Sequence, residues 1–106
     1  MTRIEVKTQL GHNVVSREHG KTMRALLEKA LSDAPSVIVD FEGMQITSVS
    51  FFDESFGVLA KQYGGEALLN RVKFERIDPF DLALVRDIIA SRWREAKKAH
   101  RVTSFR

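Results

Sequence analysis

The amino-acid sequence predicts a layered α/β domain, in which helices pack against a mixed β-sheet. Short segments rich in β-branched residues, at 2–8, 37–40 and 72–77, alternate with longer segments whose apolar residues recur every three or four positions. This alternation of strands and helices is typical of α/β folds with right-handed crossovers. The 106 residues fit one domain, residues 1–106, without an internal repeat or linker.

Three elements are expected before the central strand. Residues 2–8 alternate in polarity and predict a half-buried strand. The Gly-His-Asn sequence at 11–13 predicts a turn, and the two valines at 14–15 predict a short second strand. Ser16 is the expected cap of a helix that ends near Ser32. The apolar face of this helix comprises Met23, Leu26, Leu27, Ala30 and Leu31.

The segment 37–40 predicts the central strand, because it is apolar and β-branched up to its final acid. A helix is expected to begin at Phe51, with Ser50 as its cap and Asp53 three residues after the cap. The glycine pair at 64–65 is expected to end this helix. Its predicted buried face comprises Phe52, Ser55, Phe56 and Leu59.

The C-terminal helix has a strong start signal. It follows the strand predicted at 72–77, with Asp78 as cap and Pro79 at the first helical position. We expect it to end near Lys98 and to be followed by a frayed tail at 100–106. Its predicted buried stripe comprises Leu82, Val85, Ile89 and Trp93.

Hydroxyl and acidic side chains gather where the central strand leads into the helix. Ser48 and Ser50 are candidate phosphoacceptors or, with Thr47, partner contacts. Alternatively, Ser50 caps the helix and Ser48 satisfies a turn. Asp53 and Glu54 either contact a partner or only stabilise the first helical turn through the helix dipole.

Asp40 ends the central strand and needs a partner if it is buried. We expect a local hydrogen bond in the turn that follows, rather than a catalytic role. A hydrolase pair or hard-cation site built from Asp40, Glu42, Asp53 and Glu54 is an alternative that their spacing does not require.

The composition argues against an enzyme. The chain has no cysteine, no Gly-x-Ser-x-Gly elbow and no phosphate-binding glycine loop. His12, His19 and His100 fall on separate elements without metal-ligand spacing. We therefore expect no catalytic activity, no cofactor and no metal site. No apolar run approaches the ~20 residues that span a bilayer, and no signal segment opens the sequence, so a cytoplasmic location is expected.

Basic residues cluster on one side of the predicted C-terminal helix. At about 100° per residue they lie away from its apolar stripe. The simplest interpretation is a solvated face with cations near the helix C-terminus. The functional alternative is a contact for nucleic acid. The cluster comprises Arg86, Arg94, Lys97, Lys98 and Arg101.

The centre of the chain resembles the STAS-like domains of unknown function. The residues that carry this resemblance are Asp40, Phe41, Gly43, Ile46, Ser48, Ser50, Phe51, Asp53, Glu54, Gly57 and Leu59. The resemblance implies a STAS-like fold and a non-enzymatic regulatory module. It also implies a protein partner, such as an ATPase-type kinase or an anti-sigma-like protein. That partner would bind at the turn and helix spanning 47–63, with Arg17 joining the surface.

The sequence departs from the anti-sigma-factor antagonists of the wider STAS family. Those proteins carry Asp-Ser-Ser-Gly-Leu at this helix start, and the first serine accepts phosphate. Counting from Asp40, that position falls on Val49, with Ser48 and Ser50 on either side. Phosphorylation of Ser50 or Ser48 and phosphate-independent binding therefore both stay open.

Overall fold

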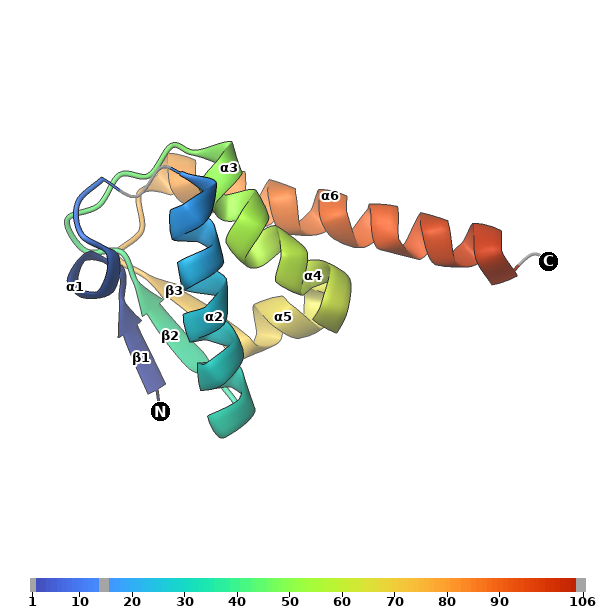
Figure 1. The fold of residues 1–106 in the computed structure, drawn as a ribbon, viewed down its shortest axis with the longest axis horizontal. Helices are drawn as coiled ribbons and strands as arrows, with labels where there is room; N and C mark the ends of the chain where they lie inside the picture. The colour runs from blue at the N-terminus through green and yellow to red at the C-terminus, as the bar shows by residue number, and fades with distance from the viewer. Residues whose placement is uncertain (1, 14–15, 105–106) are drawn as a thin grey trace.

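The computed structural model describes residues 2–13 and 16–104, which form a sheet with helices around it (Figure 1). In chain order, the elements are β1 (Thr2–Glu5), α1 (Val6–Leu10), α2 (Arg17–Asp33), β2 (Val37–Asp40), α3 (Val49–Phe52), the π-helical η1 (Asp53–Gly57), α4 (Val58–Tyr63), α5 (Gly65–Arg71), β3 (Val72–Glu75) and α6 (Pro79–Ser104). The α/β prediction is confirmed.

The described sheet is parallel, with strand order β1-β2-β3, so the expectation of a mixed sheet is wrong for the described residues. Each strand reaches the next through helices, and such crossovers return the chain in the same direction. The predicted strand 2–8 also ends early, at Glu5, because residues 6–10 turn into α1. The second strand predicted at 14–15 lies outside the described residues.

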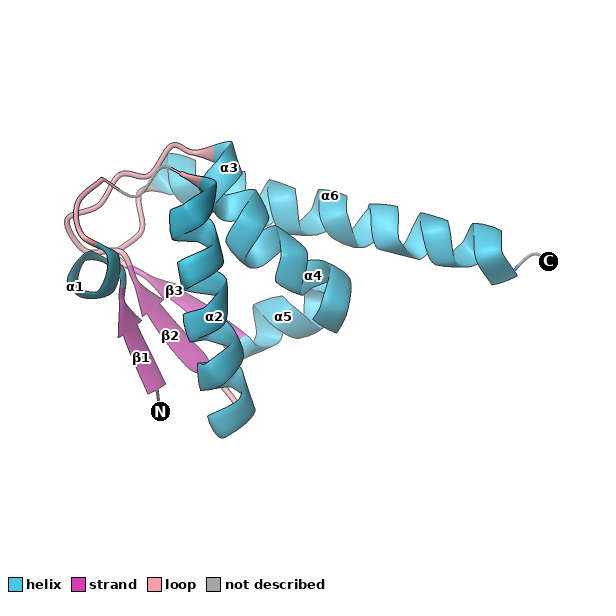
Figure 2. Cartoon of the chain, in the orientation of Figure 1, coloured by secondary structure: helices cyan, strands magenta, loops and turns pink. Residues whose placement is uncertain are grey.

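The helices and the sheet enclose the core between them (Figure 2). Val37 of β2 pairs with Thr2 of β1 and with Val72 of β3, so alternate residues share a face across all three strands. On the helix side, Val39 and Phe41 pack in a cluster with Phe52 and Phe56, all at most 1% exposed. The prediction of a central strand at 37–40 is confirmed.

Helix α2 matches its prediction closely. The Ser16 hydroxyl accepts a hydrogen bond from the His19 amide at 3.2 Å, as the cap was expected to do. Four of the five predicted core residues are buried, and Leu26 is half-buried against the core. The local sequence pattern was sufficient to predict α2 because the cap and the apolar face both belong to this one element.

The helical segment after β2 differs from its prediction. The helix begins at Val49 rather than Phe51, and its cap is Ser48, whose hydroxyl accepts from the Phe51 amide at 3.1 Å. The segment then widens into η1, where the Ser55 hydroxyl donates to the Phe51 carbonyl at 2.7 Å. A side chain that occupies a helical carbonyl in this way loosens the regular ladder. The predicted buried face is confirmed, since all four residues are fully buried.

Helix α6 begins as predicted, and Asp78 accepts from the amides of Phe80 at 2.9 Å and Asp81 at 3.3 Å. It continues to Ser104, past the expected end near Lys98, and projects beyond the other elements (Figure 1). Its stripe is buried at Val85 and Ile89 but only half-buried at Leu82 and Trp93. Across residues 2–13 and 16–104, none of the helices combines the length and apolar character needed to cross a bilayer.

Gly20 allows α2 to pack directly on the backbone of the segment that carries η1. A Cβ at this position would lie 2.8 Å from both the Phe51 carbonyl oxygen and the Glu54 Cβ. In an open helix Gly→Ala stabilises by about 1 kcal/mol. Here we expect Gly20→Ala to lower the free energy of unfolding by about 1–3 kcal/mol, measured by urea denaturation. Lys21→Ala, at the exposed next residue, should change it by less than about 0.5 kcal/mol. A more stable Gly20→Ala protein would contradict this packing.

Candidate functional site

The candidate site is the tip, residues 47–54, where the chain leaves the β2 loop and enters α3 and η1. The loop before it is fixed by Asp81 in the first turn of α6. The Asp81 carboxylate accepts from the Ile46 amide at 2.6 Å and the Thr47 amide at 2.8 Å. Asp81 is 1% exposed, and Thr47 has a φ of 44°. A buried carboxylate with two backbone donors therefore sets where the loop ends and α3 begins.

The strand end that leads to the tip is held by a second carboxylate. Asp40 accepts from the Glu42 amide at 3.0 Å, so the predicted local hydrogen bond is confirmed. It also pairs with Arg3 at 3.0 Å. Arg76 donates to it twice, through Nε at 3.1 Å and through Nη2. The hydrogen bond from Arg76 outweighs burial and lowers the pKa of Asp40. Asp40 is thus an ionised structural anchor that links β2 to Arg3 of β1 and to Arg76, which follows β3.

The tip presents one apolar side chain among hydroxyls. Val49 is 60% exposed, although it begins a helix whose next apolar residue, Phe51, is fully buried. Ser48 and Ser50 on either side are half-buried, and Thr47 is exposed. Because Ser48 caps the helix, the predicted assignment of this role to Ser50 is wrong. Ser50 instead lies within the first turn of α3.

The two acids of the tip are held from both neighbouring helices. Arg92 of α6 forms a two-point pair with Asp53, through Nη2 at 2.6 Å and through Nε. Arg24 of α2 donates to Glu54 Oε2 at 2.9 Å and to the Glu54 carbonyl at 2.9 Å. Arg17 lies between the acids, 3.1 Å from a Glu54 oxygen and 3.6 Å from an Asp53 oxygen. The structure therefore brings Arg17 to Asp53 and Glu54.

These contacts favour the charged form of both acids. The hydrogen bond from Arg92 lowers the pKa of Asp53 despite its burial, and the hydrogen bonds from Arg24 and Arg17 lower the pKa of Glu54. Asp53 in turn raises the pKa of Arg92. The acids do more than stabilise a helix dipole, because they attach η1 to α2 and α6.

The four acids considered as a hydrolase pair or cation site separate into two arginine-bound groups. Asp40 and Glu42 share Arg76, whereas Asp53 and Glu54 share Arg17. Among the side chains that the structure describes, which end at Lys98, no three histidine or acidic groups converge on a metal-sized site. Among the histidines, His12 is exposed, His19 Nδ1 lies 2.9 Å from the Ser16 hydroxyl, and the side chain of His100 is outside the described part.

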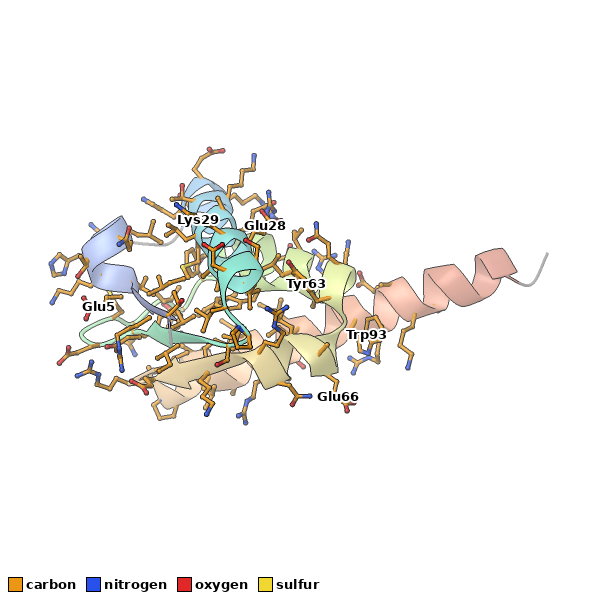
Figure 3. The ribbon with its side chains drawn as sticks, turned by 90° about the horizontal axis from the view of Figure 1, so that it is seen from below. Glu5, Glu28, Lys29, Tyr63, Glu66 and Trp93 are labelled. Atoms are coloured by element: carbon orange, nitrogen blue, oxygen red, sulfur yellow. The ribbon has the colours of Figure 1, made fainter. Side chains whose placement is uncertain are left out.

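The basic face of α6 is exposed at Arg86, Arg94, Lys97 and Lys98, while the Arg101 side chain lies outside the described residues. The Lys97 ammonium is 5.6 Å from the centre of the Trp93 ring, which Figure 3 labels on α6. Arg92 was missed as a site residue because the cations of α6 were considered only as a surface cluster. One helical turn before it lies the buried Ile88, and that spacing could have placed Arg92 on the inward side.

Comparison with known proteins gives one match. A family model for the STAS-like domain of unknown function matches residues 19–81, from α2 to the first turn of α6. Searches of curated proteins and of solved structures return no match. The matched segment contains β2, the tip and the Asp81 carboxylate, but it ends before Arg92.

The Asp53–Arg92 pair predicts a pH-dependent mutational effect. Arg92→Gln leaves the carboxylate of Asp53, whose side chain is 11% exposed, without its main partner. We expect the free energy of unfolding at pH 7 to fall by about 2 kcal/mol, less than for a fully buried pair because the Arg92 side chain is 31% exposed. Urea denaturation of the wild type and the variant measures this difference.

The difference should shrink as the pH falls. In the wild type the pKa of Asp53 is lowered, so the stability from the pair is complete above about pH 4–5 and is lost as the pH falls through the folded-state pKa. In Arg92→Gln, burial instead raises that pKa, and protonation relieves the unpaired charge. Arg94→Gln, at an exposed position of the same helix, should match the wild type at every pH. If Arg92→Gln lowered the free energy of unfolding equally at pH 7 and pH 4, Arg92 would not be the residue that stabilises the Asp53 carboxylate.

Proposed function

The chain belongs to the family of STAS-like domains of unknown function, and from this premise we propose that it is a non-enzymatic regulatory module that binds a protein partner. The binding surface is the tip, residues 47–54, together with the helices that follow it up to Tyr63. The partner class that the STAS resemblance suggests is an ATPase-type kinase or an anti-sigma-like protein.

The observation that carries this proposal is an exposed apolar residue on an immobilised backbone. Val49 is 60% exposed, while the chain on either side of it is fixed by Asp81 and by the arginine pairs of Asp53 and Glu54. A preorganised surface binds with a smaller loss of conformational entropy than a mobile loop. Arg17, whose side chain is 57% exposed, adds a cation beside the tip.

This arrangement refines which residues would touch the partner. Asp53 is buried and already paired, so it supports the surface from below, and Glu54 has a side-chain exposure of only 18%. The accessible contacts are Thr47, Val49 and Arg17, with the Ser50 hydroxyl at the margin. The proposed interface is therefore an apolar contact flanked by hydroxyls and one cation.

Phosphorylation of Ser50 or Ser48 would regulate the same surface. Ser48 is the helix cap, and a phosphate there would sit at the positive end of the α3 dipole. A phosphate at either serine would also place about two negative charges next to Val49. Binding through Val49 does not need this modification, so phosphate-independent association is part of the proposal.

A capture experiment tests the tip as the interface. Tagged wild-type protein and Val49→Asp are used to retrieve partners from lysate of the source cells, and the retained proteins are compared by mass spectrometry. Because Val49 is exposed, the substitution should leave the fold intact and reduce partner recovery at least tenfold. Ala25→Asp, which alters an exposed apolar residue of α2 outside both proposed binding surfaces, is the matched control and should retain the partner. Full recovery by Val49→Asp would exclude the tip as the interface.

The basic face of α6 supports a second candidate function, the binding of nucleic acid. The specific observation is that α6 projects beyond the sheet (Figure 1). Its cations Arg94, Lys97 and Lys98 are exposed. Trp93 lies beside them, but it is half-buried and packs on the turn of Gly64 and Gly65. A Cβ added at either glycine would lie 3.3–3.7 Å from atoms of its ring. The ring is therefore poorly placed to stack on a base.

Salt dependence distinguishes this second function. If the face binds nucleic acid, affinity for a fluorescent single- or double-stranded DNA should fall steeply between 50 and 200 mM salt, with a slope set by the phosphates neutralised. Replacing Arg94, Lys97 and Lys98 with Glu should abolish binding, and the circular dichroism spectrum should not change. Absence of DNA and RNA binding at low salt would remove this function, whereas the Val49→Asp variant should have no effect on it.

A further inference from the structure

A groove of about 440 Å³ runs along the free edge of β3. It is lined by Leu69, Val72, Lys73, Phe74, Leu82 and Arg86, which come from α5, β3 and α6. Consecutive residues of a strand point to opposite faces of the sheet, so a groove that touches three of them in a row must follow the strand edge. In the described sheet, β3 is an outer strand, with β2 on its other side.

The backbone of β3 presents hydrogen-bonding groups to this groove. The Phe41 amide donates to the Glu75 carbonyl at 2.9 Å, so the peptide groups of Glu75 point toward β2. Alternate residues of a parallel strand direct their groups to opposite sides, so the N–H and C=O of Phe74 point outward. The Val72 amide is already used, since it donates to the Leu68 carbonyl at the end of α5. Phe74 is thus the centre of an open strand edge.

The side chains around this edge combine apolar walls with positive charge. Leu69 is 37% exposed, and Leu82 is half-buried on the opposite side. Lys73 and Arg86 are both exposed, and no acidic residue lines the groove. A ligand that fits must supply backbone groups for Phe74, apolar side chains for the walls and negative charge for the two cations.

We propose that this groove binds an extended segment of a protein partner, with alternating apolar and acidic residues, which adds to β3 as a further strand. Strand addition gives affinity through the main chain, and alternate side chains give specificity. A second copy of the chain fits less well, because it would bring its own Lys73 and Arg86 to the same groove. Its Glu75, which could offset one of these charges, is already 2.9 Å from Arg3. The groove lies on elements other than the tip, so the inference stands independently of the function proposed above.

A designed probe tests the charge requirement. The probe is a fluorescein-labelled seven-residue peptide of alternating Glu and Val, and the comparison peptide has Lys in place of Glu. By fluorescence anisotropy we expect saturable binding of the Glu peptide and at least tenfold weaker binding of the Lys peptide. The variant Lys73→Glu/Arg86→Glu should reverse this preference. The control variant Arg94→Glu/Lys98→Glu changes the net charge by the same amount at exposed positions of α6 outside the groove. It should still prefer the Glu peptide.

A backbone measurement tests the strand pairing itself. Hydrogen exchange of the Phe74 amide, followed by NMR, should slow when the Glu peptide is bound, while the Lys21 amide on α2 should not change. Absent binding, equal binding of both peptides or unchanged Phe74 exchange would each overturn the proposal. A dimer in sedimentation that Leu69→Asp dissociates would also overturn it, because the groove would then be occupied by a second copy.

Discussion

The pairing of Asp53 with Arg92 is the constraint on which the tip depends. A carboxylate taken out of water must be paired, and Asp53 is 8% exposed. Its partners come from α6, through Arg92, and from α2, through Arg17, so the charge is satisfied only when both helices close on η1. The two helices can approach η1 this closely only where the side chains between them are small. Gly20 supplies the space on the α2 side, and a Cβ on Gly57 would lie 3.2 Å from Arg92 Cγ on the other side.

This constraint changes the chemical character of the tip. The acids that appear in the sequence as a negative surface are directed inward and neutralised by arginines, so the outer surface is defined by Val49 and hydroxyl groups. The helix start is fixed in the same way by a residue remote in sequence, because Asp81 takes the amides of Ile46 and Thr47. The tip is therefore shaped by α6 at two points, its first turn and Arg92.

The parts of this structure that local patterns determine could be predicted from the sequence. The central strand, the apolar face of α2 and the start of α6 each depend on residues within one element. The choice between Ser48 and Ser50 as cap could not be predicted, since both serines precede an apolar run and the Asp81 contact decides between them. The ion pairs of Arg24 and Arg92 join residues 30 and 39 positions apart. The spacing from Ile88 indicates the inward side for Arg92, but no local signal identifies the acid with which either arginine pairs. The parallel sheet was missed for a similar reason, because the turn of residues 6–10 into α1 has no strong signal.

Helix α6 contacts both of the surfaces proposed for partners. Asp81 and Arg92 hold the tip, and Leu82 and Arg86, which lie between them in the sequence, line the groove beside β3. A ligand at one surface changes the other only if it binds two arrangements of α6 with different affinity. The buried Asp81 and Asp53 contacts oppose any such movement, because shifting α6 would leave a carboxylate without its partners. The two surfaces are therefore expected to bind independently, and coupling between them would require one of these two carboxylate contacts to break.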